Sequence, residues 1–153
     1  MKKELTDIFE VDSVLKTLVL CVLTIGSYLI YKLYRFSSQI NEHTKLKIPN
    51  YFILTTVILF TISLGSLIYG LVNIHDLSIL KSSIGIHLVS SVFDVTWLIM
   101  IRNRINQISG SNKGDTLWLN PFITSILHVI YIQHKINQSL VKAAIYKQLK
   151  RDS

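Results

Sequence analysis

Four polar side chains lie inside long apolar runs of the sequence, where an ionisable group is costly. His87, Ser91 and Asp94 are spaced i, i+4 and i+7 in the run 84–101, which places them on one face of a helix. His128 lies in the apolar part of a later segment. A histidine and an aspartate near the middle of a membrane can relay protons. Two other roles fit Asp94: hydrogen bonding that fixes helix packing, and contact with a partner subunit.

Other chemistry is not indicated. A haem held between His87 and His128 needs more than two histidines on separate helices, so no cofactor is expected. The sequence has no serine nucleophile elbow, glycine-rich phosphate loop or HExxH motif. The acidic residues are too scattered for a metal site, and Cys21 is the lone cysteine. We therefore expect neither an enzyme nor a metalloprotein.

The composition predicts a membrane protein. Of the 153 residues, 50% are hydrophobic and 16% are charged, with a mean hydropathy of +0.43. Soluble domains carry about 25% charged residues. The net charge of +7 arises largely from basic residues at the ends of apolar runs, which favours anionic lipid headgroups over nucleic acid as the partner.

The elements that position these side chains are predicted to be membrane helices. We expect an all-α integral membrane protein, built as a helical bundle of two hairpins with three clear spans. A shorter fourth segment either spans or is re-entrant, and a basic amphipathic helix follows it. The predicted parts are a polar lead at 1–13, a transmembrane domain at 14–137 with helices near 14–40, 48–74, 77–107 and 120–137, and a tail at 138–153.

Small and basic residues supply the remaining candidate sites. Small residues that permit close helix packing are Gly26, Thr61, Gly65, Ser66 and Gly70. Basic residues expected at lipid headgroups are Lys32, Arg35, Arg102, Arg104, Lys142, Lys147 and Lys150. The loops and the tail predict opposite orientations if all four segments span, so the orientation stays open.

The two halves of the chain resemble each other. In each half an aromatic residue and two basic residues lead to an Ile-Asn pair, Ile40-Asn41 or Ile105-Asn106, and then to a polar loop. A proline, Pro49 or Pro121, and a new apolar run follow. The alternative explanation is that membrane hairpins commonly end in aromatic and basic residues.

Three short stretches carry a further pattern. They are Thr24-Ile25-Gly26-Ser27-Tyr28, then Ile105-Asn106, and then Asn120-Pro121 leading to Tyr131-Ile132-Gln133 and Ile136-Asn137. This pattern resembles an uncharacterised family of small bacterial membrane proteins, with a threonine-x-glycine-x-tyrosine motif on an early helix and a tyrosine-x-glutamine…asparagine ending. The resemblance covers about residues 17–138. It implies a four-helix membrane fold and no established activity.

These observations predict a multi-pass protein of the bacterial cytoplasmic or inner membrane. The expected role is an accessory, assembly or interaction subunit that contacts itself or a larger membrane protein. Asp94 and the small-residue face of 48–74 are the expected contact points. The alternative is a small proton- or ion-coupled transporter or channel component that uses Asp94 and His87. Membrane lipids are the other expected partner.

Overall fold

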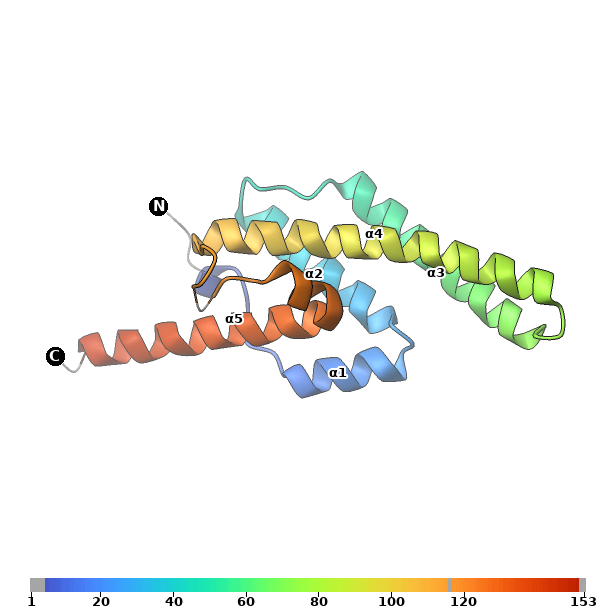
Figure 1. Cartoon of the computed structure of the whole chain (residues 1–153). Coiled ribbons are helices and arrows are strands. Elements are labelled where there is room, and N and C mark those ends of the chain that lie inside the picture. Colours follow the sequence, from blue (N-terminus) through green and yellow to red (C-terminus); the bar gives the residue numbers. More distant parts are fainter. Residues whose placement is uncertain (1–4, 116, 152–153) are drawn as a thin grey trace. The chain divides into compact units, whose positions relative to one another are not determined.

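The computed structural model describes residues 5–115 and 117–151, apart from the side chains of Thr6 and Lys147. This part of the chain is all-α, as predicted, and contains no strand (Figure 1). A 3-10 turn, η1 (Leu5–Asp7), precedes five α-helices. These are α1 (Val14–Leu23), α2 (Ser27–His43), α3 (Asn50–Val72), α4 (Leu77–Ser109) and α5 (Pro121–Arg151).

The prediction of one long helix over 14–40 is wrong. The chain turns between α1 and α2, where Ile25 has φ 49° and Gly26 has φ 83°. Residues of a right-handed helix have φ near −63°, so two successive positive values end α1 and reverse the chain. With 10 residues, α1 is too short to cross a bilayer of about 30 Å, and α2, with 17, carries Lys32, Arg35 and Glu42 and is too polar to do so.

Two helices in the described residues, α3 and α4, are long and apolar enough to cross a membrane. This is one fewer than the three clear spans predicted, because the first segment is broken. Side chains set the starts of these helices. Pro49 precedes α3, and Asp76 Oδ1 accepts hydrogen bonds from the backbone N–H groups of Ser78 and Ile79 at the start of α4.

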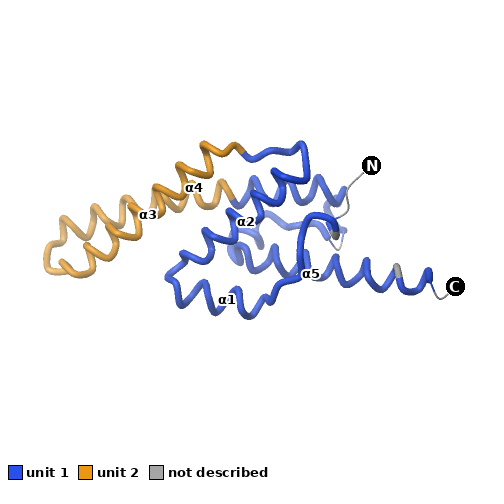
Figure 2. Tube along the Cα trace, turned by 180° about the vertical axis from the view of Figure 1, so that it is seen from behind, with its two compact units in different colours: residues 1–48, 98–153 blue, residues 49–97 orange. Residues whose placement is uncertain are grey.

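The chain divides into two compact units (Figure 2). Unit 1 contains residues 1–48 and 98–153, and its described part holds η1, α1, α2, the end of α4 and α5. Its core is apolar. The side chains that are at most 3% exposed include Phe9, Leu33, Phe36, Ile40, Ile48, Leu98, Ile101, Ile105, Leu119, Val129, Ile132 and Ile136. The predicted polar lead contributes to this core, since Phe9 packs edge-on against Phe36 with ring centroids 6.0 Å apart.

Unit 2 is the hairpin of α3 and the first part of α4, residues 49–97. Its buried side chains are chiefly small and polar: Thr56, Ser63, Ser83 and Ser90. Its exposed side chains are chiefly apolar, and they include Leu54, Ile58, Ile62, Ile68, Leu71, Val72, Ile84, Leu88 and Val92. Such a hairpin presents hydrocarbon outwards and polar groups inwards, the reverse of a water-soluble domain.

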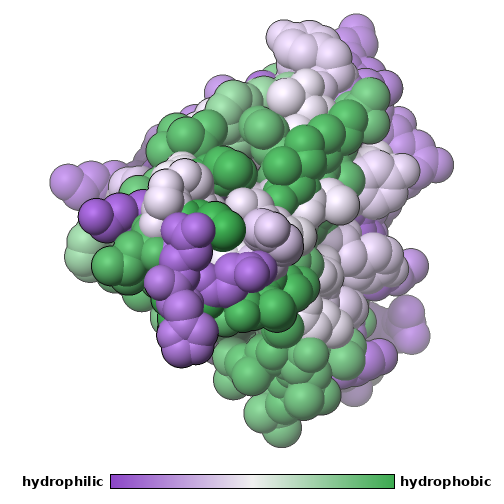
Figure 3. Space-filling model, turned by 90° about the vertical axis from the view of Figure 1, so that its right-hand side faces the viewer, coloured by the Kyte–Doolittle hydropathy of each residue, from purple (hydrophilic) through white to green (hydrophobic). Residues whose placement is uncertain are grey.

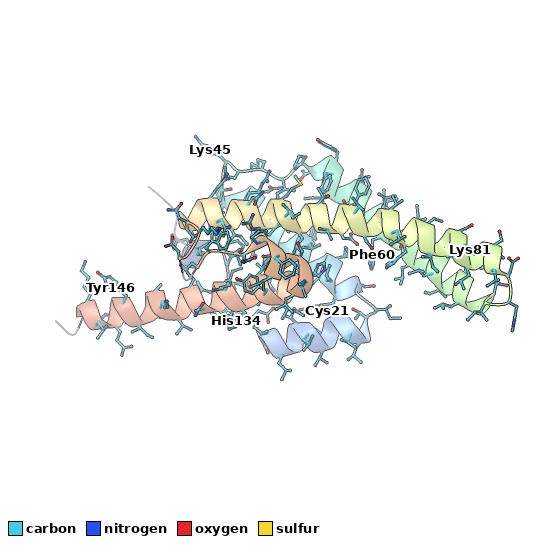
Figure 4. All side chains as sticks on the ribbon, viewed as in Figure 1. Cys21, Lys45, Phe60, Lys81, His134 and Tyr146 are labelled. Carbon is cyan, nitrogen blue, oxygen red and sulfur yellow. The ribbon has the colours of Figure 1, made fainter. Side chains whose placement is uncertain are left out.

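α5 is one helix with a kink. Asn120 Oδ1 accepts from the backbone N–H groups of Phe122 and Ile123 and begins the helix. His128 interrupts it with φ 48° and ψ −138°. The helix then continues through residue 138, where the amphipathic tail was predicted to begin. It exposes Val141, Ile145, Tyr146 and Leu149, and Figure 4 labels Tyr146 near the end of the helix.

Candidate functional site

The polar side chains predicted to act together on α4 take three different environments. His87 Nδ1 lies 2.8 Å from Ser63 Oγ, which links α4 to α3 inside unit 2. Ser91 Oγ donates to the backbone carbonyl of His87 on its own helix. His87 and Asp94 are separated by seven residues, about 10 Å along a helix axis, which is too far for a direct hydrogen bond. The structure therefore shows no His87–Asp94 pair.

Asp94 is half-buried in unit 2, and its Oδ1 atom has no hydrogen-bond partner in the described part of the chain. Ser90 lies one turn earlier on the same face of α4, and its buried Oγ likewise has none. Buried polar atoms are nearly always hydrogen-bonded, because each unsatisfied one costs about 1–3 kcal/mol. Two such atoms at i and i+4 therefore mark a place where a donor from outside the described chain would be stabilising.

His128 lies in unit 1, at the kink of α5. It lies between the exposed Leu127 and the fully buried Val129, and its Nδ1 atom has no partner among the described residues. A histidine with φ 48° is uncommon, and the left-handed region favours glycine and asparagine. His128 therefore interrupts the helix, and nothing in the structure assigns it a ligand.

The small residues of α3 divide between two faces. A Cβ atom added to Gly70 would lie 2.7 Å from Ser83 Oγ, so the two helices approach closely there. Gly65 has no atom within 4 Å of the equivalent position, and it is exposed. Thr61, one turn before Gly65, is also exposed and donates to the carbonyl of Val57. Gly70 thus packs inside the hairpin, whereas Thr61 and Gly65 face outwards.

A buried cluster in unit 1 was missed by the sequence analysis. Lys32 was assigned to lipid headgroups, but it is 1% exposed and cannot take that role. Its Nζ atom donates to Asp12 Oδ2 at 2.6 Å and to Gln133 Oε1 at 3.0 Å. The ammonium also lies 5.6 Å from the centre of the Phe36 ring. An isolated buried ammonium is very costly, so these partners offset the cost of burying Lys32 inside the unit.

Asn137 ties the same cluster to the N-terminal segment. Its Nδ2 donates to the Asp12 carbonyl at 2.7 Å, and its Oδ1 accepts from the Asp12 backbone N–H at 3.3 Å. Gln133 Nε2 donates to the same Oδ1 at 2.9 Å. The hydrogen bond from Lys32 lowers the pKa of Asp12 below its ordinary value of 3.8. The segment before α1 is thereby joined to α2 and α5.

The signal for this cluster was present as the Gln133…Asn137 ending, at i and i+4 on one helix. The sequence does not say which cation these amides meet, because Lys32 and Gln133 are 101 residues apart.

Two matching asparagine clamps close the loops of unit 1. Asn41 Nδ2 donates to the Ile48 carbonyl at 2.9 Å, and Asn41 Oδ1 accepts from the Ile48 N–H at 2.6 Å. Asn106 makes the same two bonds with Leu119, at 3.2 and 2.9 Å. Ile48 and Leu119 are both buried in the core. An asparagine side chain therefore closes a loop through the same two hydrogen bonds in each half, which supports an internal repeat.

The other predicted headgroup residues make contacts within unit 1. Arg35 pairs with Glu10 at 2.5 Å. Arg102 donates to the Leu119 carbonyl at 2.8 Å and lies 5.6 Å from the Trp118 ring. Arg104 donates to the carbonyls of Met100 and Lys47. Lys142 and Lys150 lie on the exposed end of α5, and the side chain of Lys147 lies outside the described residues.

Comparison with known proteins gives no match to a family model, a curated protein or a solved structure. The described residues hold no group of three or more histidine, cysteine, aspartate or glutamate side chains placed to bind a metal ion.

Proposed function

We propose that this chain is a small, multi-pass interaction subunit of a bacterial cytoplasmic membrane. The α3–α4 hairpin lies in the lipid and contacts another membrane protein or a second copy of the chain. The observation that carries the proposal is the inverted hairpin, with hydroxyl groups and Gly70 inside and apolar side chains outside. Apolar side chains, green in Figure 3, cover much of the face shown there.

Contact with a second helix is supported by two features of unit 2. Thr61 and Gly65 form an outward-facing pair of small residues, a spacing that lets another helix approach closely in a membrane. Asp94 Oδ1 and Ser90 Oγ lack hydrogen-bond partners among the described residues, and an aspartate in a membrane helix normally finds one. A donor from the neighbouring helix would satisfy them.

The Thr61–Gly65 face is tested with Gly65→Leu. Within the chain this change meets no atom, so it leaves the hairpin intact and blocks only a neighbouring helix. The control is Gly85→Leu, which is also open but has Lys81 and Val89 at the positions four residues away and so lacks the small-xxx-small spacing. We expect only Gly65→Leu to abolish the oligomer or the co-purified partner in mild detergent. Equal assembly of both variants contradicts the proposal.

Asp94 is tested with Asp94→Asn, with Thr96→Val as the control because Thr96 is exposed and bonds only to its own helix. The interaction subunit predicts weaker assembly for Asp94→Asn alone. Loss of proton or ion flux in vesicles with assembly intact would instead favour the transporter.

A further inference from the structure

The turn between α1 and α2 exposes apolar side chains where polar ones are usual. Val22, Leu23 and Ile25 are 71, 72 and 70% exposed. Figure 4 labels Cys21, one residue before them on the last turn of α1. Turns in water are dominated by glycine, asparagine, aspartate and serine. A tip of three large apolar side chains is suited to hydrocarbon.

The backbone N–H groups of this turn need no water. Every N–H group from residue 24 to residue 30 donates within the hairpin. The acceptors, in order, are the carbonyls of Leu20, Val22, Cys21 and Thr24, the Oγ1 atom of Thr24, and the carbonyl of Gly26 twice. The Thr24 hydroxyl itself donates to the Leu20 carbonyl. Within a bilayer no water is available to hydrogen-bond backbone groups, so partners for all of these N–H groups inside the hairpin lower the cost of placing the turn in lipid.

Ile25 is a poor choice for a turn in water. It is β-branched and has φ 49°, a conformation that costs free energy for every residue except glycine and is tolerated best by asparagine. Either glycine or asparagine would relieve the strain, and asparagine would also suit water. An exposed isoleucine at this position is explained if its side chain is in contact with lipid.

The positions of the charged residues and the length of α1 indicate how deeply the α1–α2 hairpin can enter a bilayer. Residues 17–31 carry no charge, and the exposed Lys16 marks one end of the stretch. Tyr31 and Tyr34, each about half exposed, mark the other, as aromatic residues do at a membrane interface. The ion pair of Asp12 and Lys32 closes the base. The 10 residues of α1 extend about 15 Å, half of a hydrocarbon core of about 30 Å.

We propose that the α1–α2 hairpin is re-entrant: it enters one leaflet of the bilayer, places its tip among the acyl chains and leaves on the side from which it entered. The occupant of this surface is lipid hydrocarbon. A protein groove is disfavoured because lysine and tyrosine lie at the base, in the order of a membrane interface, and the large side chains of the tip are all apolar. No residue of α3 or of the first part of α4 takes part, so this inference stands or falls separately from the proposed function.

Sidedness tests the path of the chain. In a Cys21→Ala background, Lys16→Cys and Tyr34→Cys are combined in the full-length chain and reconstituted into sealed vesicles of phosphatidylcholine and phosphatidylglycerol. A membrane-impermeant maleimide is added and the intact mass is measured. A re-entrant hairpin gives molecules with two labels or none, whichever way the chain inserts. One label on each molecule means that the segment crosses the bilayer, which overturns the proposal.

The tip is tested by depth. Leu23→Cys, labelled with an environment-sensitive fluorophore, avoids the strained position and is expected to be quenched by lipids brominated near the middle of their acyl chains. Absence of quenching means that water or protein covers the tip, and either finding overturns the proposal.

The matched pair Ile25→Asn and Ile25→Gly separates the effect of backbone strain from the effect of solvent, because both substitutions relieve the strain. We expect Ile25→Asn to lose this quenching and Ile25→Gly to keep it; the same quenching in both variants contradicts a lipid-exposed tip.

Discussion

In unit 1 the fully buried side chains are mostly large and apolar, whereas in unit 2 they are mostly hydroxyl-bearing, and one of these, Ser83, packs against Gly70. Both units expose leucine, isoleucine and valine, so the difference between them lies in the side chains that they bury. The two regions therefore differ in the contacts that can hold each of them together. Burial of apolar area stabilises unit 1 because it removes that area from water. It does not hold two helices together inside lipid, because the acyl chains are as apolar as the side chains.

The two units also differ in where their polar contacts lie. In unit 2 the Ser63–His87 hydrogen bond and the close approach of Gly70 to Ser83 join α3 to α4. In unit 1 the buried Lys32 is surrounded by apolar residues and is paired with Asp12 and Gln133. A hydrogen bond and a close contact of small residues therefore help to join the two helices of the hairpin, whereas in unit 1 the Lys32 cluster is a polar junction inside an apolar core.

The largest expected effect is at that junction. Asp12→Ala leaves the buried Lys32 ammonium with Gln133 as its remaining side-chain acceptor. Removing one partner of a buried pair costs about 3–5 kcal/mol. Glu10→Ala is the control, since Glu10 pairs with Arg35 on the surface and such pairs contribute about 0–1 kcal/mol. Chemical unfolding of both variants measures the difference; equal losses would contradict the role given to Lys32.

The second-largest expected effect is a difference in stability loss between two leucine-to-alanine substitutions in α4. Leu98 is fully buried in unit 1, and Leu98→Ala is expected to lower the free energy of unfolding by about 2–5 kcal/mol. Leu88 is 63% exposed in unit 2, so Leu88→Ala creates no cavity. We expect it to leave stability in lipid nearly unchanged, as measured by unfolding in mixed micelles. A large loss at Leu88 would show that this surface is packed against protein.

A smaller effect compares two glycines of α3. Gly70→Ala forces Ser83 to move and is expected to cost about 1–3 kcal/mol. Gly65→Ala meets no atom of the chain, and it also replaces glycine in a helix, so it is neutral or slightly stabilising. Thermal unfolding in detergent gives both values. Destabilisation by Gly65→Ala in the monomer would show that this face is used inside the chain.

The smallest effect is the pH dependence of the Lys32 cluster. Because the folded-state pKa of Asp12 lies below 3.8, the ion pair stabilises unit 1 above that value and is lost as the pH falls through the folded-state pKa. We expect the stability difference between the native chain and Asp12→Asn to shrink as the pH is lowered from 7 to 3. A difference that is constant over this range would show that the carboxylate charge contributes nothing.

The parts of the fold that the sequence predicts well depend on local patterns. The uncharged stretch 48–74 and the apolar run 84–101 each lie within one helix or next to its end, because length and hydropathy are local properties. The break at Ile25 was missed because a single glycine in an apolar run is compatible with a continuous helix, and an isoleucine with positive φ has no sequence signal.

For the candidate site, too, the sequence predicts local structure but not contacts between distant residues. The one-face spacing of His87, Ser91 and Asp94 was read correctly as helical, but their partners depend on tertiary contacts, such as that between His87 and Ser63. Lys32 was assigned to headgroups because basic residues at the ends of apolar runs usually go there. Its acceptor Gln133 is 101 residues away, and only the fold brings the two together.

The most direct test of the central claim, that the hairpin of unit 2 is immersed in lipid, uses two cysteines on either side of α3. Lys45→Cys and His75→Cys are combined in the Cys21→Ala chain, reconstituted into sealed vesicles and treated with an impermeant maleimide. Both native side chains are exposed, so the substitutions leave the core untouched. If α3 crosses the bilayer, intact mass shows one label on every molecule. Molecules carrying two labels or none would contradict the account.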